Sequence, residues 1–194
     1  MEWWQWLIVA LSVAIALFIL LINPKTRLTK LLSEQAKVFY KYEGAEEKQR
    51  KLSVLDLISF FVIPLMLSCG LVWGFSYCFT KESANILLTV VSILFSVLFS
   101  ILSIIVAKSK TTDEIEKSVV KETFVSICTS SVLLLVSMIM LIIYVLIFGD
   151  GENTLWPMML SNLILLTLFH VLMLILMIIK RFVLIYIKGK KMNK

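Results

Sequence analysis

Apolar positions along this chain come in long runs that are separated by short polar segments. Each run is long enough for a helix that crosses a bilayer. The five runs cover about 4–22, 54–79, 85–107, 123–148 and 156–179. The polar segments between and after them include 23–53, 108–122 and 180–194. No linker or internal repeat divides the chain, so the pattern predicts one all-α integral membrane domain over 1–194, a bundle of five transmembrane helices.

The basic residues orient this bundle. Eighteen of the 19 Lys and Arg residues lie in 23–53, 108–122 and 180–194, and the remaining one is Lys81. Because cytoplasmic loops carry the excess of Lys and Arg, we expect the N-terminus outside and the C-terminus in the cytoplasm. The first run starts among three tryptophans, Trp3, Trp4 and Trp6, with no basic residue before it, so we expect a retained anchor and not a cleaved signal peptide. We therefore predict a multi-pass protein of the bacterial inner membrane.

The polar segment after the first run has an amphipathic pattern. Its apolar positions keep helical spacing at Leu28, Leu31, Leu32, Val38, Phe39 and Tyr42. The spacing predicts a cytoplasmic amphipathic helix within 25–53 that ends at Gly44. Two placements are open: the helix lies along the membrane interface, or it packs beneath the bundle.

The third run contains a line of hydroxyl side chains. They stand at steps of three, four, four and three residues, namely at Thr89, Ser92, Ser96, Ser100 and Ser103. Such spacing places them on one face of a helix. This line either packs closely against another helix or lines a wetted path across the membrane. In the second case Phe95 and Phe99, which flank the line, are candidates for a hydrophobic gate.

Two further polar residues lie inside the fifth run. His170 is an ionisable residue near its middle, where it could sense pH, relay protons or constrict a pore. The alternative is a neutral imidazole that bonds to a hydroxyl of a neighbouring helix, such as Ser96 or Ser100. Asn162 lies two turns away, near the outer end of any polar path, so we count both with the pore-lining candidates.

Composition supports the membrane assignment and offers no catalytic machinery. Hydrophobic residues make up 60% of the chain and charged residues 16%, which is too apolar for a soluble domain. The three cysteines lie within apolar runs and lack the spacing of a metal site. There is one histidine, no Gly-rich phosphate loop and no nucleophile motif. We expect no catalytic residue, metal or cofactor; a lipid-processing enzyme would have only His170, Asp56 and Asp150 to use.

Basic residues on the cytoplasmic side form the last candidate site. If they converge around a symmetry axis, they form a vestibule for an anionic ligand such as a nucleotide, or for lipid headgroups. The candidates are Arg50, Lys51, Lys108, Lys110, Lys180 and Arg181. The alternative is that they serve membrane topology and contact anionic lipid only. We expect no binding to a nucleic-acid duplex.

In architecture the chain resembles small multi-span membrane proteins of bacterial anti-phage systems, the Hailong membrane effectors and the Kiwa membrane subunits. The resemblance rests on the missing catalytic site, the serine-lined third run and the basic cytoplasmic segments. It implies a homo-oligomer such as a tetramer, in which a cytoplasmic nucleotide or partner protein triggers depolarisation. Our first hypothesis is thus a non-enzymatic oligomeric channel or effector. The second is an accessory or sensor subunit that binds a transporter or signalling partner through 25–53.

Overall fold

A computed structural model describes residues 28–38, 40–42, 50–52, 54–108, 114–148 and 155–192 of the 194-residue chain. The described residues are helical apart from one short antiparallel strand pair and the turn at 75–80. The elements in chain order are α2 (Leu28–Val38), β1 (Tyr40–Tyr42), β2 (Arg50–Leu52), α3 (Val54–Cys69), the π-helical turn η1 (Gly70–Gly74), α4 (Lys81–Lys108), α5 (Glu114–Phe148) and α6 (Leu155–Met192).

Three helical stretches are long and apolar enough to cross a membrane, which fits a multi-pass membrane protein. They are Lys81–Ala107, Val119–Phe148 and Leu155–Val183. A shorter apolar stretch, Phe60–Gly74, forms most of α3 and η1. The predicted first span, 4–22, lies outside the described residues. The predicted helical bundle is therefore confirmed for these helices, whereas the count of five spans stays a prediction.

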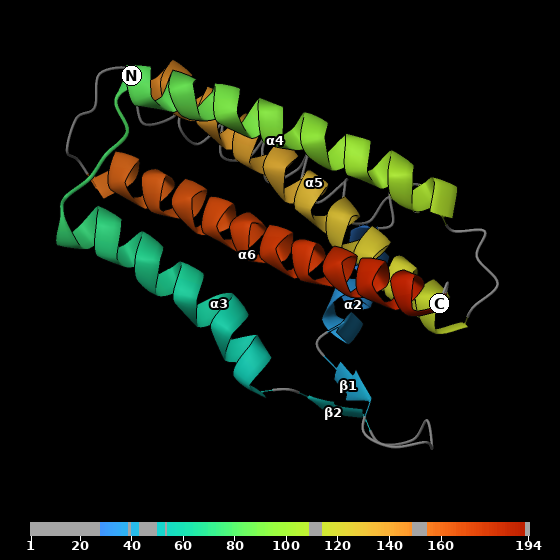
Figure 1. Cartoon of the computed structure of the whole chain (residues 1–194). Coiled ribbons are helices and arrows are strands. Elements are labelled where there is room, and N and C mark those ends of the chain that lie inside the picture. The colour runs from blue at the N-terminus through green and yellow to red at the C-terminus, as the bar shows by residue number, and fades with distance from the viewer. Residues whose placement is uncertain are drawn as a thin grey trace.

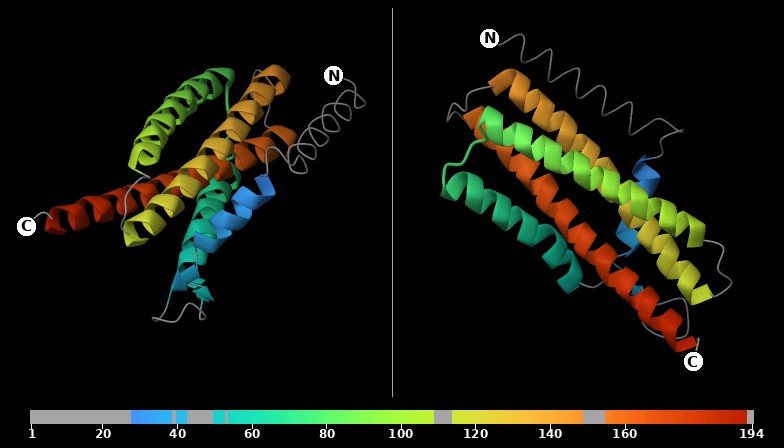
Figure 2. Two further views of the ribbon diagram at one scale, coloured as in Figure 1. Left: turned by 90° about the vertical axis from the view of Figure 1, so that its right-hand side faces the viewer. Right: turned by 45° about the horizontal axis from the view of Figure 1, so that its top comes forward.

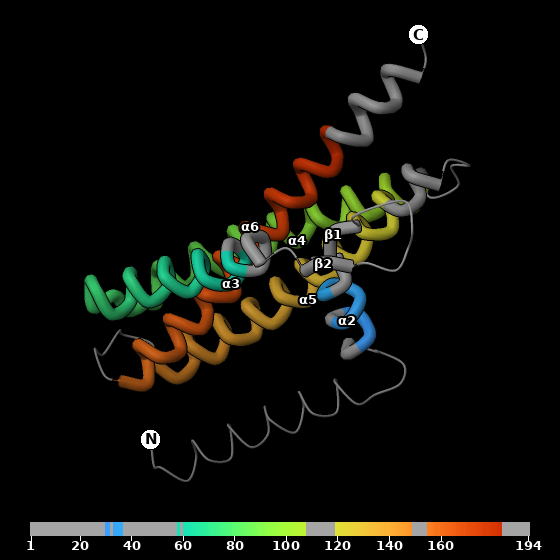
Figure 3. The backbone as a smooth tube through the Cα atoms, turned by 90° about the horizontal axis from the view of Figure 1, so that it is seen from below, coloured from blue at the N-terminus to red at the C-terminus, as the bar shows by residue number. Residues whose placement is uncertain are grey.

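Helix α5 is the central element of the bundle. It packs against α4 on one side and α6 on another, and α3 packs against α6 (Figure 1). Figure 3 shows α3 and α6 alongside each other from below. Both α5 and α6 extend past their membrane-spanning stretches, Val119–Phe148 and Leu155–Val183, without a break. Pro157 lies in the first turn of α6, where its missing N–H has no helical partner to lose.

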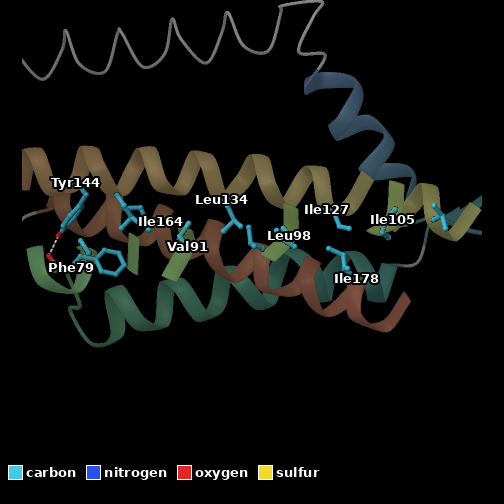
Figure 4. Packing of buried hydrophobic residues seen from close by; sticks show 13 residues of the cluster. Phe79, Val91, Leu98, Ile105, Ile127, Leu134, Tyr144, Ile164 and Ile178 are labelled. Carbon is cyan, nitrogen blue, oxygen red and sulfur yellow. Dashed lines mark hydrogen bonds between the residues drawn. The ribbon is translucent and has the colours of Figure 1, made fainter. Parts of the chain in front are cut away.

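The core repeats every seven residues in the three long helices (Figure 4). This spacing keeps one row of each helix facing its neighbours along the whole depth of the bundle. The rows are Ala84, Val91, Leu98 and Ile105 in α4; Val120, Ile127, Leu134 and Leu141 in α5; and Ile164, Val171 and Ile178 in α6. Each of these side chains is at most 5% exposed.

The helix predicted over 54–79 ends at Gly74, five residues early. The backbone turns at Ser76, which has a φ of 49°, and Phe79 enters the core. There the Tyr144 hydroxyl donates a hydrogen bond to the Phe79 carbonyl at 2.7 Å, and the two rings meet edge to face (Figure 4). The burial of the Phe79 ring and the hydrogen bond to its carbonyl stabilise this non-helical turn.

The amphipathic helix predicted within 25–53 is also shorter than expected. It ends at Val38 and not at Gly44, because Tyr40–Tyr42 forms a strand that pairs with Arg50–Leu52. Tyr40 and Tyr42 alternate with Lys41, which favours a strand. The prediction missed this because Tyr42 also fits the helical spacing of the apolar residues before it. Helix α2 packs against α5 (Figure 2), and Glu34 pairs with Lys121 at 3.7 Å. These contacts favour the placement against the bundle over the placement along the membrane interface.

Candidate functional site

The hydroxyl stripe, defined as Thr89, Ser92, Ser96, Ser100 and Ser103, lies on the outer face of α4. Thr89, Ser96 and Ser103 each follow a core residue by five positions, which is about 140° around an α-helix. Four stripe residues are exposed, and Ser92 is half-buried. The stripe therefore packs against no other described helix of the same chain. A close-packed seam or a wetted path on this face needs a partner from outside the described bundle.

Each stripe hydroxyl donates a hydrogen bond to the carbonyl four residues earlier in α4. The donor–acceptor distances run from 2.8 Å at Ser92 to 3.1 Å at Thr89, Ser96 and Ser103. The donors are thus satisfied without a neighbour, although each hydroxyl oxygen can still accept a bond. A row of such oxygens can contact water, an ion or the donors of another helix.

The two gate candidates flank the stripe as predicted from their positions. The rings of Phe95 and Phe99 are in contact in a tilted arrangement, with centroids 5.1 Å apart and an interplanar angle of 48°. Phe99 is 51% exposed, whereas Phe95 is half-buried against the core. Their rings form a bulky apolar patch beside Ser96, in the middle of the helix.

His170 has a structural partner, but it is not the predicted one. Its Nδ1 lies 3.2 Å from the carbonyl oxygen of Phe60 in α3, whereas Ser96 and Ser100 bond within α4. Pro64 is the residue four positions after Phe60 and has no N–H to offer that carbonyl. A carbonyl oxygen only accepts, so Nδ1 carries the proton in this pair. The expected hydrogen bond to Ser96 or Ser100 is wrong, because the proline creates a better acceptor on α3.

Asn162 also faces α3, where its Nδ2 lies 3.8 Å from the Cys69 sulfur. The predicted pore-lining residues therefore fall into two groups in one chain: the stripe on the outside of α4, and Asn162 with His170 between α6 and α3. Since α5 lies between α4 and α6 in the packing order, a single chain does not bring the groups to one path.

The fourth predicted span also carries hydroxyl residues, whose burial against neighbouring helices the sequence did not predict. Ser126, Thr129, Ser130 and Ser131 stand in the predicted span, and all four are buried together with Thr123 and Ser137. The Ser137 hydroxyl is 2.9 Å from that of Thr167 in α6, a bond across the helix pair. Small polar residues let α5 approach its neighbours closely. Thr123, Ser126, Ser130 and Ser137 stand at steps of three, four and seven residues, so they share one face of α5, and this spacing was available in the sequence.

Arg181 lies inside the bundle and pairs with α5. Its Nη2 is 3.3 Å from Glu122 Oε2, and its Nη1 donates to the Ser126 hydroxyl at 3.1 Å; its side chain is only 12% exposed. Lys180, by contrast, is exposed. Lys108 ends α4, Arg50 and Lys51 belong to β2, and Lys110 lies outside the described residues. That these residues bind an anion stays a prediction, and Arg181 would have to leave Glu122 to take part.

Within the described residues no three His, Cys, Asp or Glu side chains gather where they could hold a metal ion.

Comparisons with protein-family models, with curated proteins and with solved structures give no match.

Proposed function

We propose that this protein is a non-enzymatic, homo-oligomeric channel or effector of the bacterial inner membrane, in which the hydroxyl stripes of several copies surround an ion path. A cytoplasmic nucleotide or partner protein opens it, the membrane depolarises and growth stops, as in anti-phage defence. Four copies around an axis would place four α4 helices side by side. Phe99, and Phe95 beside it, would then narrow the path near its middle.

The observation that supports this proposal is the exposure of the stripe. Five polar positions in line on a face that no described helix of the chain covers are poor partners for hydrocarbon, even with their donors satisfied. If copies associate through this face, the hydroxyl oxygens face one another or the water between them. The same face would otherwise be the most polar lipid-facing surface of the bundle.

Cysteine crosslinking in native membranes tests the association. In a background with Cys69, Cys78 and Cys128 replaced by Ala, we expect Ser96→Cys to form a disulfide-linked dimer on mild oxidation. Val97→Cys is the matched control, because Val97 is exposed at the same depth but off the stripe. Equal crosslinking of both variants, or none in either, would contradict an α4-centred oligomer.

The alternative function is an accessory or sensor subunit, and the docking of α2 on α5 is the observation in its favour. A signal received by α2 would reach the central helix directly through the Glu34–Lys121 contact. A photoreactive residue at Ser33, which is exposed on α2, separates the two functions. Capture of one heterologous protein from Ser33, without self-crosslinks at Ser96, supports the accessory subunit.

A further inference from the structure

Helix α2 carries a buried polar side chain that has no hydrogen-bond partner among the described residues. Gln35 is only 6% exposed, and both its Nε2 and its Oε1 are unpaired. The described helix that α2 packs against is α5, so we attribute this burial to docking on α5. An exposed amide would bond to water through both atoms, and the docked helix loses these bonds without replacing them. Docking therefore has a cost that undocking would remove.

Gln35 also interrupts the apolar pattern of its own segment. Leu28, Leu31 and Leu32 precede it by seven, four and three residues, and this spacing places all four positions on one side of a helix. A leucine or methionine at position 35 would continue the apolar side and leave no unpaired atom. A polar residue at one core position of a helix contact lowers the stability of that contact. The docking of α2 is thus weakened within its apolar side.

The ion pair of α2 does not offset this cost. Glu34 lies 3.7 Å from Lys121, whose side chain is 74% exposed, and exposed ion pairs contribute little. Helix α2 has 11 residues, which is too short for a helix that is stable alone in water. An undocked α2 therefore needs a second apolar surface to remain helical.

The charge of the segment indicates that this surface is an anionic membrane. Between residues 25 and 42 there is one acidic residue, Glu34, and the basic residues are Lys25, Arg27, Lys30, Lys37 and Lys41. Lys121 is close to the start of the membrane-fit stretch Val119–Phe148, so α2 docks at the end of the bundle, near the level of a membrane surface. Basic amphipathic helices bind to anionic headgroups there, with their apolar side among the acyl chains. At this hydrated boundary water and headgroups can bond to the Gln35 amide.

From the unpaired amide and the basic, amphipathic pattern, we infer that α2 is a two-state element that either docks on α5 or lies on an anionic membrane surface. The two placements that the sequence left open are then two states of one protein. Anionic lipid shifts the ratio toward the membrane state, because Glu34 pairs with Lys121 only in the docked state and the undocked helix brings its basic residues to the headgroups. The inference holds for a channel and for an accessory subunit alike.

Distances between two spin labels measure the two states. Ser33→Cys on α2 and Val183→Cys on α6, both at exposed positions, carry the labels in a full chain with Cys69, Cys78 and Cys128 replaced by Ala. Labelled protein is diluted with unlabelled protein in vesicles of phosphatidylcholine, alone or with phosphatidylglycerol. We expect one main distance in phosphatidylcholine alone. A second population should grow with the phosphatidylglycerol content and shrink at high salt.

Gln35→Met tests the role of the unpaired amide. This variant removes both unpaired atoms and should shift the ratio of docked to undocked α2 about tenfold toward docking. Ala36→Met is the matched control, because Ala36 is the exposed neighbour and the same side chain there lies outside the contact. Lys30→Gln, at another exposed position, should weaken the response to phosphatidylglycerol about fivefold. Gln35→Leu replaces Gln35→Met if that variant does not fold.

Three outcomes overturn the inference. The first is a single distance in all vesicles for the chain with Gln35. The second is a second population that is equally large with and without phosphatidylglycerol. The third is an equal shift in Gln35→Met and Ala36→Met.

Discussion

Helices α4 and α5 both carry serines four residues apart, yet the structure uses these serines in opposite ways. Ser100 bonds to the Ser96 carbonyl at 3.0 Å, and Ser130 bonds to the Ser126 carbonyl at 2.8 Å. Ser130 is fully buried inside the bundle, whereas Ser100 is exposed on its outside. The local hydrogen bond is the same, but the pairs differ in burial and in the bond that the Ser126 hydroxyl accepts from Arg181.

The difference shows what a polar position in an apolar helix does. On α5, small hydroxyl residues allow α2, α4 and α6 to pack around one helix. On α4, the same residue type forms a line that no described part of the chain covers. No described helix of the chain packs on the stripe, and this exposure is the reason for our proposal that the stripe faces an assembly of chains.

The largest expected effect comes from enlarging one serine of each pair. Ser130→Leu forces a bulky side chain into a packed interior and should destabilise the chain by about 1–3 kcal/mol. Ser100→Leu should change the stability of the monomer by less than about 0.5 kcal/mol, as surface substitutions do. Unfolding by SDS in mixed micelles measures both. Equal destabilisation would show that the α4 face is packed within the chain.

The next largest loss of stability is expected in α6, where the polar residue His170 also stabilises the fold. His170→Ala removes the partner of the Phe60 carbonyl and should cost about 1–2 kcal/mol. Pro64→Ala supplies the missing N–H, so His170→Ala should cost much less in that background. A double-mutant cycle on unfolding free energies checks this. Additive effects would contradict the pairing of proline and histidine.

A smaller loss of stability distinguishes a hydrogen bond between two helices from a hydrogen bond within one helix. Ser137→Ala removes the contact with Thr167 and should cost about 0.6 kcal/mol, the average for such bonds in membrane helices. Ser96→Ala removes only a bond within α4 and should leave the unfolding midpoint of the monomer unchanged. Calorimetric or SDS midpoints compare the two variants, and a larger loss at Ser96 would be inconsistent with its exposure.

The smallest effect concerns the contact of α5 with α2. Lys121 and Glu34 are 3.7 Å apart, and the lysine side chain is 74% exposed. Lys121→Ala should therefore cost at most about 0.5 kcal/mol, because exposed ion pairs contribute little. A loss above about 2 kcal/mol would mean that this pair, and not the burial around Gln35, holds α2 in place.

The sequence predicted the helices better than their faces. Long apolar runs predicted the positions of α4, α5 and α6, because backbone N–H and C=O groups inside hydrocarbon must be hydrogen-bonded and a continuous helix achieves this. It did not reveal which side of α4 meets α5, since lipid and protein interior are equally apolar and both accept leucine. The core row at every seventh residue was visible only once Ala84 and Ile105 were seen to be buried.

The sequence placed the hydroxyl stripe on one helix face, but it did not predict the hydrogen-bond partner of His170. The spacing of Ser96 and Ser100 was sufficient to place them on one face. The partner of His170 was not predictable from that pattern, because it depends on Pro64 lying at the same depth of a helix far away in sequence. A useful signal was present all the same: a proline inside an apolar helix leaves a carbonyl that a polar residue elsewhere tends to satisfy.

Water access to α4 tests the central claim most directly. Ser96 lies near the middle of the Lys81–Ala107 stretch, about 22 Å along the helix from Lys81. In the cysteine-free background, Ser96→Cys should react with a membrane-impermeant thiol reagent, and Val97→Cys should not. A Ser96→Cys thiol that stays unreactive in stable, membrane-inserted protein, with and without the activating signal, would contradict a wetted path along the stripe.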